Sequence, residues 1–305
     1  MRICSLLPSA TEILYALGAG DQLVGVSHEC DFPPEALRQP RVLRTTLDSS
    51  LRSSAAIDAA VREAVSRGEP LYRLDDEALR RAAPDLIITQ ELCDVCAIGA
   101  PDVVRVARTL PHPPQVISLH PHTLRDVMQD IRALGEATGR SAAAASLITA
   151  CQERLARVRA AVDGAPRPSV FCLEWIEPPM ATGHWVPEMV ECAGGREVLG
   201  RAGQRSRYVT WDEVIAAAPD VLILMPCGVD PERARQELAP LATARWWNEL
   251  PAVQAGRVHV LDGSAYFNRP GPRLIDGVEL LAARLHPMRY NTAVFEVSHR
   301  RTPDL

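Results

Sequence analysis

Residues 139–164 read GRSAAAASLITACQERLARVRAAVDG, and the rest of the chain is arranged around them, with no proline or glycine between the two end residues. Alanine, leucine, glutamine, glutamate and arginine dominate the stretch, and all five favour helices. Ser141 is suited to cap the start of a helix, and Gly164 followed by Pro166 ends it. Apolar side chains recur at three- and four-residue spacing and predict one apolar stripe: Leu147, Cys151, Leu155, Val158 and Val162.

This stretch predicts a helix of about 23 residues, which spans roughly 34 Å at about 1.5 Å per residue. That length is close to the diameter of a small domain, and the stretch lies almost midway along the chain. It is typical of two structures, an ordinary surface helix or a rigid strut that joins two lobes. The sequence on either side has to decide between them.

The composition is that of a soluble globular protein with one large domain or two of ordinary size. The chain has 305 residues, of which 47% are hydrophobic and 23% are charged, and its net charge is -5. No broad basic face is implied, so nucleic acid is not expected as a partner. No apolar run of roughly 18 residues occurs, so no membrane span is expected. The eight cysteines are spread over the chain, which predicts mostly reduced thiols.

The first residues, MRICSLLPSATEI, go directly into what is expected to be a strand. They lack a basic segment followed by an apolar segment and a cleavage site, the pattern of a signal peptide. With Met1 as the natural start, the sequence predicts a cytoplasmic protein. The alternative is a periplasmic or extracellular protein whose signal peptide has been removed.

Two matching half-patterns lie on the two sides of the central stretch. DDEALRRAA at 75–83 precedes PDLIIT at 84–89, and TWDEVIAAA at 210–218 precedes PDVLIL at 219–224. AGDQLVG and GGREVLG form a second pair in the same order. Because strands and helices alternate in both halves, the sequence predicts an α/β protein with two Rossmann-like lobes, mainly parallel sheets, and one long helix joining them.

The predicted domain boundaries follow from this repeat. Residues 1–139 are expected to form an N-terminal α/β lobe, 140–164 the linking helix, and 165–305 a C-terminal α/β lobe with a tail. The first half carries about 40 more residues between its paired signals, so the repeat is not a solenoid. Within it, residues 34–50 are expected to be irregular and Ser54–Ser66 to be an amphipathic helix.

In parallel sheets, ligands bind beyond the carboxyl ends of the strands, so the loops there are the candidate sites. Ser9 lies at a predicted helix start whose N–H groups suit an anion, although simple helix capping is the favoured interpretation. Trp175 and Trp185 lie in loops rich in proline and glycine, where aromatic side chains line clefts or fill the core beneath the loop. The segment 267–269 combines an aromatic ring, an amide and a cation ahead of Pro-Gly-Pro, which suits a polar ligand or a packed surface loop.

A cysteine–histidine set in the first half is a candidate metal site. Cys93 and Cys96 form a C-x-x-C, and His28 and Cys30 lie on a neighbouring loop. Thiolates and imidazoles are good ligands for zinc or another transition metal, and two from each loop would make four. Free or redox-active cysteines fit the same spacing, because H-x-C is not a standard finger spacing.

Known catalytic signatures are missing. The chain contains no G-x-x-x-x-G-K-[ST], no G-x-G-x-x-G and no G-x-S-x-G. A binding protein is therefore favoured over an enzyme. The alternatives are a transition-metal-ion binder that uses the cysteine–histidine set, and an enzyme that acts on a small molecule through reactive cysteines.

Several motifs, in the same order and spacing, resemble the vitamin B12 and iron-siderophore binding proteins of ABC importers. SLLPSATEILYALGAGDQLVGVSHECDFPP at 5–34 is similar to the opening of that family, and EWIEPPMATGHW at 174–185 resembles its cobalamin-binding branch. CAGGREVLG, PDVLIL, GRVHVLD and RPGPR follow in family order. The resemblance spans about residues 2–285, and it departs from secreted members in lacking a signal peptide.

The resemblance implies a class III binding-protein fold, with a ligand cleft between two lobes and rim aromatics over a flat corrin face. The ligand it implies is cobalamin, a related corrinoid or another metal chelate, held for solute binding, storage or chaperoning. An ABC permease is the implied partner if the protein is exported. The expected ligand contacts are Ser9, His28, Glu29, Trp175, His184, Trp185, Phe267, Asn268 and Arg269. The cysteine–histidine set has no equivalent in typical secreted members.

Overall fold

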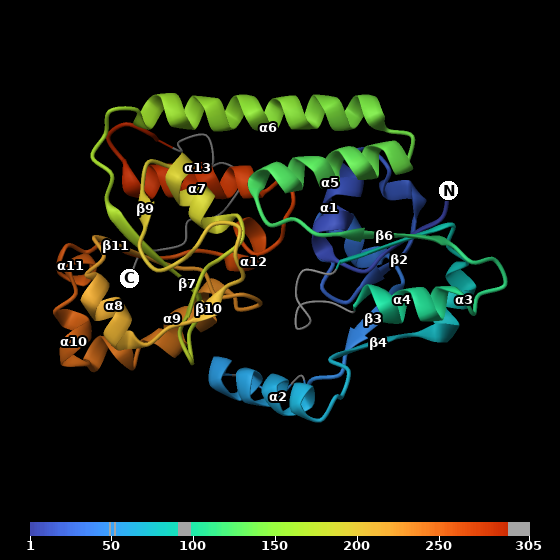
Figure 1. The fold of residues 1–305 in the computed structure, drawn as a ribbon, viewed down its shortest axis with the longest axis horizontal. Coiled ribbons are helices and arrows are strands. Elements are labelled where there is room, and N and C mark those ends of the chain that lie inside the picture. Colours follow the sequence, from blue (N-terminus) through green and yellow to red (C-terminus); the bar gives the residue numbers. More distant parts are fainter. Residues whose placement is uncertain (49, 52, 91–98, 292–305) are drawn as a thin grey trace. The chain divides into compact units, whose positions relative to one another are not determined.

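The computed structural model describes residues 1–48, 50–51, 53–90 and 99–291, and these residues form two compact units. Unit 1 consists of 1–52, 56–121 and 125–150, and unit 2 consists of 53–55, 122–124 and 151–305. Each unit holds its own sheet (Figure 1). Each unit is described separately below. The predicted domain boundaries and the predicted cleft between the lobes stay predictions.

Unit 1 is built on a six-stranded sheet with the order β4-β3-β2-β1-β5-β6. All neighbouring pairs are parallel except β3 with β4. Its strands are β1 (Ile3–Ser5), β2 (Leu23–Ser27), β3 (Arg41–Thr45), β4 (Tyr72–Leu74), β5 (Leu86–Gln90) and β6 (Gln115–Leu119). Its helices and 3₁₀ turns are α1 (Pro8–Ala16), η1 (Gly20–Gln22), η2 (Pro34–Arg38), α2 (Ser54–Ser66), α3 (Asp76–Ala82), α4 (Ala100–Ala107) and α5 (Leu124–Ala137).

Unit 2 is built on a sheet with the order β10-β8-β7-β11-β12, and β9 pairs with β7. The strands β7, β11 and β12 run parallel, whereas β8 is antiparallel to β7 and β10. Its strands are β7 (Ser169–Trp175), β8 (Met180–Ala181), β9 (Arg196–Glu197), β10 (Arg207–Tyr208), β11 (Val221–Leu224) and β12 (Val258–Val260). Its helices and 3₁₀ turn are α7 (Val186–Cys192), α8 (Trp211–Ala217), α9 (Pro231–Leu238), η3 (Leu241–Thr243), α10 (Arg245–Asn248), α11 (Pro251–Gln254), α12 (Gly263–Tyr266) and α13 (Leu274–Leu285).

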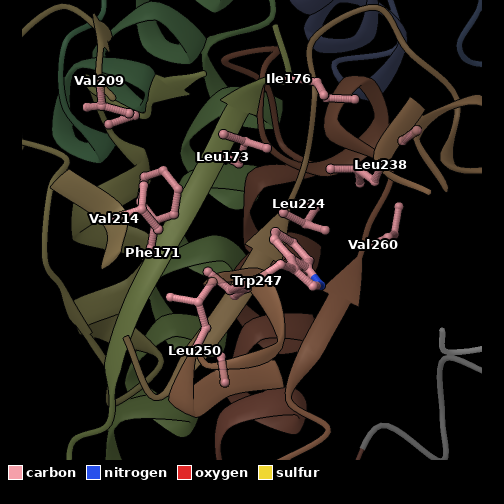
Figure 2. Packing of buried hydrophobic residues seen from close by; sticks show 14 of the residues in the cluster. Phe171, Leu173, Ile176, Val209, Val214, Leu224, Leu238, Trp247, Leu250 and Val260 are labelled. Carbon is pink, nitrogen blue, oxygen red and sulfur yellow. The ribbon is translucent and has the colours of Figure 1, made fainter. Parts of the chain in front are cut away.

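The predicted α/β class with two mainly parallel sheets is confirmed, and burial explains the strand sequences. Strands β1, β5 and β11 are buried along their whole length, as expected when helices cover both faces of a parallel sheet. Figure 2 shows the core beneath one face in unit 2, where Phe171 and Leu173 of β7 contribute to the same buried cluster as Trp247 of α10. Trp211 and Trp246 are partly buried, pack against the same cluster and contact each other's rings, with centroids 5.2 Å apart.

The predicted long helix is present as α6 (Ser141–Val162), a single helix of 22 residues. Its residues up to Ala150 belong to unit 1, and those from Cys151 onward belong to unit 2. The predicted apolar stripe is largely buried, with Cys151, Leu155, Val158 and Val162 all at most 7% exposed. No helix in the described part of the chain is both long and apolar enough to cross a bilayer.

The two half-patterns found in the sequence have the same local structure. Helix α3 ends at Ala83 and α8 ends at Ala218, and both alanines adopt the left-handed conformation, with φ of 39° and 42°. A proline follows each one and cannot continue the helix, so the chain turns directly into a buried strand. The repeated sequence thus encodes a repeated helix–strand connection.

The prediction that residues 34–50 are irregular is wrong for most of that range. A 3₁₀ helix occupies Pro34–Arg38, and β3 adds Arg41–Thr45 to the sheet. The strand has only five residues, and its place is set by parallel pairing with β2 and antiparallel pairing with β4. Such pairing is non-local, so a search for local periodicity does not detect it.

Candidate ligand-binding site

Ser9 and His28 lie at the same edge of the unit 1 sheet, because they follow the neighbouring parallel strands β1 and β2. Ser9 is buried, but its predicted role as a helix cap is wrong. Helix α1 begins at Pro8, its N-cap is Leu7, and no side chain caps it. Proline fixes φ near the helical value and lacks an N–H, so it favours a start at that position.

The loop after β2 is held in place by side chains on both of its sides. Arg41 Nη1 donates hydrogen bonds to the carbonyl oxygens of Ser27 and Cys30, at 2.8 and 2.9 Å. Cys30 is fully buried, and its Sγ lies 3.1 Å from the hydroxyl oxygen of Thr11 on α1. The loop that carries His28 is therefore fixed to both β3 and α1.

Burial raises the pKa of the Cys30 thiol, and its hydrogen bonds with Thr11 and Ser27 offset only part of that effect. The Sγ of Cys30 is enclosed, with Thr11 Oγ1 at 3.1 Å and Ser27 Oγ at 3.6 Å. Its predicted partners Cys93 and Cys96 lie outside the described residues. Within the described ranges, no group of three or more histidine, cysteine, aspartate or glutamate residues could hold a metal ion.

His28 and Glu29 remain partly accessible on this loop. The His28 ring lies 6.0 Å from the ring of Tyr72, and its Nε2 lies 4.0 Å from a carboxylate oxygen of Glu29. The His28 side chain is 27% exposed and that of Glu29 is 46% exposed. Both are thus placed to meet a ligand at this edge of unit 1.

In unit 2, the predicted aromatic residues form a buried connection between two loops. The indole Nε1 of Trp185 donates a 2.7 Å hydrogen bond to the carbonyl oxygen of Phe267. Trp185 is 3% exposed and Phe267 is not exposed at all. The rings of Trp185 and Phe267 therefore pack beneath the loops. Of the two interpretations, filling the core fits them better than lining an open rim. Direct contact with a ligand stays a prediction for both.

Asn268 and Trp175 join a third loop to this region. Asn268 Nδ2 donates to the carbonyl oxygen of Met225, which follows β11, at 3.2 Å. The Oδ1 of Asn268 is buried and has no hydrogen-bond partner among the described residues. Trp175 ends β7, is partly buried, and donates from Nε1 to the carbonyl oxygen of Glu177. The N–H of Cys227, after β11, donates to the carbonyl oxygen of Glu174 near the end of β7 at 2.9 Å. The loops after β7, β11 and β12 therefore meet, and Arg269 lies next to Asn268 on the last of them.

His184 has the most unusual surroundings of the predicted residues. Its φ is 51°, in the left-handed region that residues other than glycine seldom adopt. Its ring stacks on that of His122, with centroids 5.6 Å apart and an interplanar angle of 28°, and the Trp185 ring lies 5.5 Å away. Burial, then the neighbouring charges of His122 and Arg205, lower the pKa of His184 to about 4. The imidazole is therefore neutral at physiological pH.

The sequence did not identify His122 or Arg41 as part of these sites. His122 follows β6 by three residues and belongs to unit 2, so its place after a strand was an available signal. Arg41 gave no signal, because it lies on a strand that periodicity does not detect. The guanidinium of Arg41 acts on the site through backbone oxygens, and no motif marks such a role.

These loops lie on a fold that is shared with known proteins. The sequence matches the periplasmic binding protein family over residues 3–265. The chain belongs to this family. The resemblance inferred from the sequence motifs is thereby confirmed, since the family's members include proteins of the expected kind. A vitamin B12-binding protein of Vibrio cholerae is 26% identical over 288 residues, which cover 93% of this chain and 88% of that protein.

Solved structures of this family show the same architecture. The crystal structure of the periplasmic vitamin B12 binding protein of Vibrio cholerae matches with a TM-score of 0.66 at 25% identity, covering 93% of this chain and 96% of that one. The periplasmic heme-binding protein RhuT from Roseiflexus sp. RS-1 matches with a TM-score of 0.69 at 23% identity, covering 94% and 98%. The second likeness concerns the fold alone.

Proposed function

We propose that the chain binds a cobalamin-like corrinoid as a solute-binding, storage or chaperone protein. The observation that carries the proposal is the similarity to a vitamin B12-binding protein across 93% of the chain. Proteins that bind flat metal chelates need apolar and aromatic surface with few polar groups. The strand-end loops of unit 2 offer aromatic rings, two imidazoles and an amide in one place.

The proposed contacts fall into one group per unit. Unit 1 offers Ser9, His28 and Glu29 from the loops after β1 and β2. Unit 2 offers the loops after β7, β8 and β12 with the following residues: Trp175, His184, Trp185, Phe267, Asn268 and Arg269. The metal-ion alternative is not favoured, because Cys30 is fully buried and its Sγ already contacts the hydroxyl groups of Thr11 and Ser27. No reaction is assigned to the chain.

The partner and the compartment belong to the same proposal. A relative in Bacillus subtilis is described as an ABC transporter substrate-binding lipoprotein, and the Vibrio cholerae structure is described as periplasmic. An exported form of this chain would deliver its ligand to an ABC permease. A form that stays in the cytoplasm would store or hand over the corrinoid instead.

Gel filtration of the protein with cyanocobalamin tests the proposal. We expect the visible absorbance of cyanocobalamin to elute with the protein peak. Excess hydroxocobalamin should lower the amount of cyanocobalamin in that peak. A parallel run with hemin tests the heme-binding relatives' ligand class. Cyanocobalamin that elutes entirely in the small-molecule volume, while hemin stays with the protein, would overturn the corrinoid assignment.

A further inference from the structure

His184 is held in a conformation that its own side chain disfavours. Its φ is 51°, and its backbone is fixed by two hydrogen bonds: its N–H donates to Gln204 O at 2.6 Å, and its carbonyl accepts from Gly203 N–H at 2.8 Å. Gly183 precedes it, and a Cβ at Gly183 would lie 2.3 Å from Gln204 O. The backbone on both sides of His184 therefore fixes the position from which its imidazole extends.

The imidazole placed in this way has a ring nitrogen that makes no hydrogen bond within the described part of the chain. Its Nε2 is buried and has no hydrogen-bond partner among the described residues. An unpaired buried polar atom costs free energy, so it needs an explanation. The neighbours of the ring, His122 and Trp185, contribute ring faces at 5.6 and 5.5 Å. The residue as a whole is partly exposed, so part of its surface faces solvent.

Packing alone does not account for these features. A phenyl ring would stack on His122 without leaving a nitrogen unpaired, and glycine or asparagine would adopt the left-handed backbone with less strain. A neutral imidazole is the commonest metal ligand in proteins, and here burial keeps the ring neutral far below physiological pH. The unpaired nitrogen and the strained backbone therefore point to a ligand that is itself a metal centre.

We propose that the imidazole of His184 coordinates the metal of the bound chelate, and that the site therefore selects corrinoids with an exchangeable axial ligand. This inference rests on the proposed function and adds its chemical specificity. In the step, the nitrogen lone pair forms a bond to cobalt(III) and a water molecule leaves the same axial position. No electron is transferred and no proton is lost, since the imidazole is already neutral. Cyanide leaves cobalt far less readily than water, so cyanocobalamin would bind without this bond.

The test uses diaquocobinamide, a corrinoid with no base of its own, and compares the wild type with His184→Asn and with the exposed His112→Asn as control. Asparagine tolerates the left-handed backbone, so the first variant is expected to fold. We expect a shift in the visible spectrum of diaquocobinamide with the wild type and with His112→Asn. With His184→Asn we expect no shift and an affinity at least about tenfold weaker, a loss of about 1.4 kcal/mol.

Electron paramagnetic resonance of cobalt(II) cobinamide gives a reading that needs no variant. Nitrogen coordination from the protein splits the high-field lines into triplets, and protein labelled with ¹⁵N-histidine converts them into doublets. Unsplit lines, or an equal spectral shift with His184→Asn, would overturn the inference. If those results are obtained but the wild type still retains cyanocobalamin on gel filtration, the proposed function stands and only the coordination by His184 is rejected. If no corrinoid is retained, both fail together.

Discussion

Asp85 and Asp220 fasten the first strand of their units in the same manner. Asp85 Oδ2 accepts a 2.7 Å hydrogen bond from the backbone N–H of Arg2, immediately before β1. Asp220 Oδ2 accepts from the backbone N–H and the hydroxyl of Ser169, at 2.8 and 2.7 Å, where β7 begins. Each aspartate follows the proline of the repeated Pro-Asp pair. The repeat seen in the sequence is therefore a repeat of specific bonds.

Asp220→Ala tests how much the hydrogen bonds between Asp220 and Ser169 stabilise the fold. Removing a charged acceptor leaves the Ser169 N–H without its partner, so we expect the free energy of unfolding to fall by about 1–2 kcal/mol. The hydrogen bonds from Ser169 lower the pKa of Asp220 below its usual 3.8. The stabilisation is therefore present above that pH and lost as the pH falls through the lowered pKa. Urea unfolding at pH 7 measures the change, with the exposed Asp163→Asn as a matched control, and equal stability of both variants would contradict the account.

His184 makes the stability of the chain depend on pH. Its pKa falls from 6.5 to about 4 in the folded chain, so between these values the unfolded chain binds a proton that the folded chain does not. We expect the free energy of unfolding to decrease as the pH falls from 6.5 to 4. In His184→Asn this part of the decrease should be missing. Urea midpoints at pH 7 and pH 5 measure it, and the exposed His112→Asn is the control. Parallel pH profiles for wild type and His184→Asn would show that the environment of His184 is misjudged.

At the scale of elements, α6 and α13 are joined within unit 2 by one arginine. Arg154 donates from Nε and Nη2 to both carboxylate oxygens of Glu279, at 2.9 and 2.7 Å, and from Nη2 to Asp276 at 2.5 Å. The Glu279 side chain is only 7% exposed and that of Arg154 is 27% exposed. Burial raises the pKa of Asp276, and Arg154 offsets part of this effect. The two carboxylates therefore depend on the guanidinium.

Arg154→Ala should destabilise the chain by about 2–4 kcal/mol, because it leaves two partly buried carboxylates without their cation. Arg154→Lys should recover only part of the loss, since an ammonium group cannot make the bidentate contact. Guanidinium chloride unfolding measures both variants. Arg157→Ala, an exposed arginine on the same helix, is the control. A loss no larger than that of Arg157→Ala would mean that the ion pairs add nothing to the packing of α6.

The elements that sequence analysis predicts well are those with a strong local pattern. Helix α2 has the predicted bounds, and α6 differs by about one residue, because periodicity and helix-ending residues determine them locally. The short strands β3, β4 and β8–β10 were not predicted. They have two to five residues each, and distant pairing partners determine them.

For the whole molecule, the order of strands and helices was enough to predict an α/β protein with two mainly parallel sheets. The sheet edges at which a ligand binds stay a prediction. In the structure, the loops of Trp185 and Phe267 come together through a hydrogen bond. The sequence did not predict that both rings are buried, because burial depends on how three loops pack against one another. The stacking of His122 on His184 was missed for the same reason. Which residues touch the ligand stays a prediction.

Isothermal titration of the complete chain with cyanocobalamin tests the central claim most directly, since cyanocobalamin does not require coordination by His184. The account predicts saturable heat that fits a single site per chain, as expected for a binding protein with one ligand pocket. The claim would be contradicted if cyanocobalamin gave no heat of binding at high protein concentration. Circular dichroism must show that the protein used is folded.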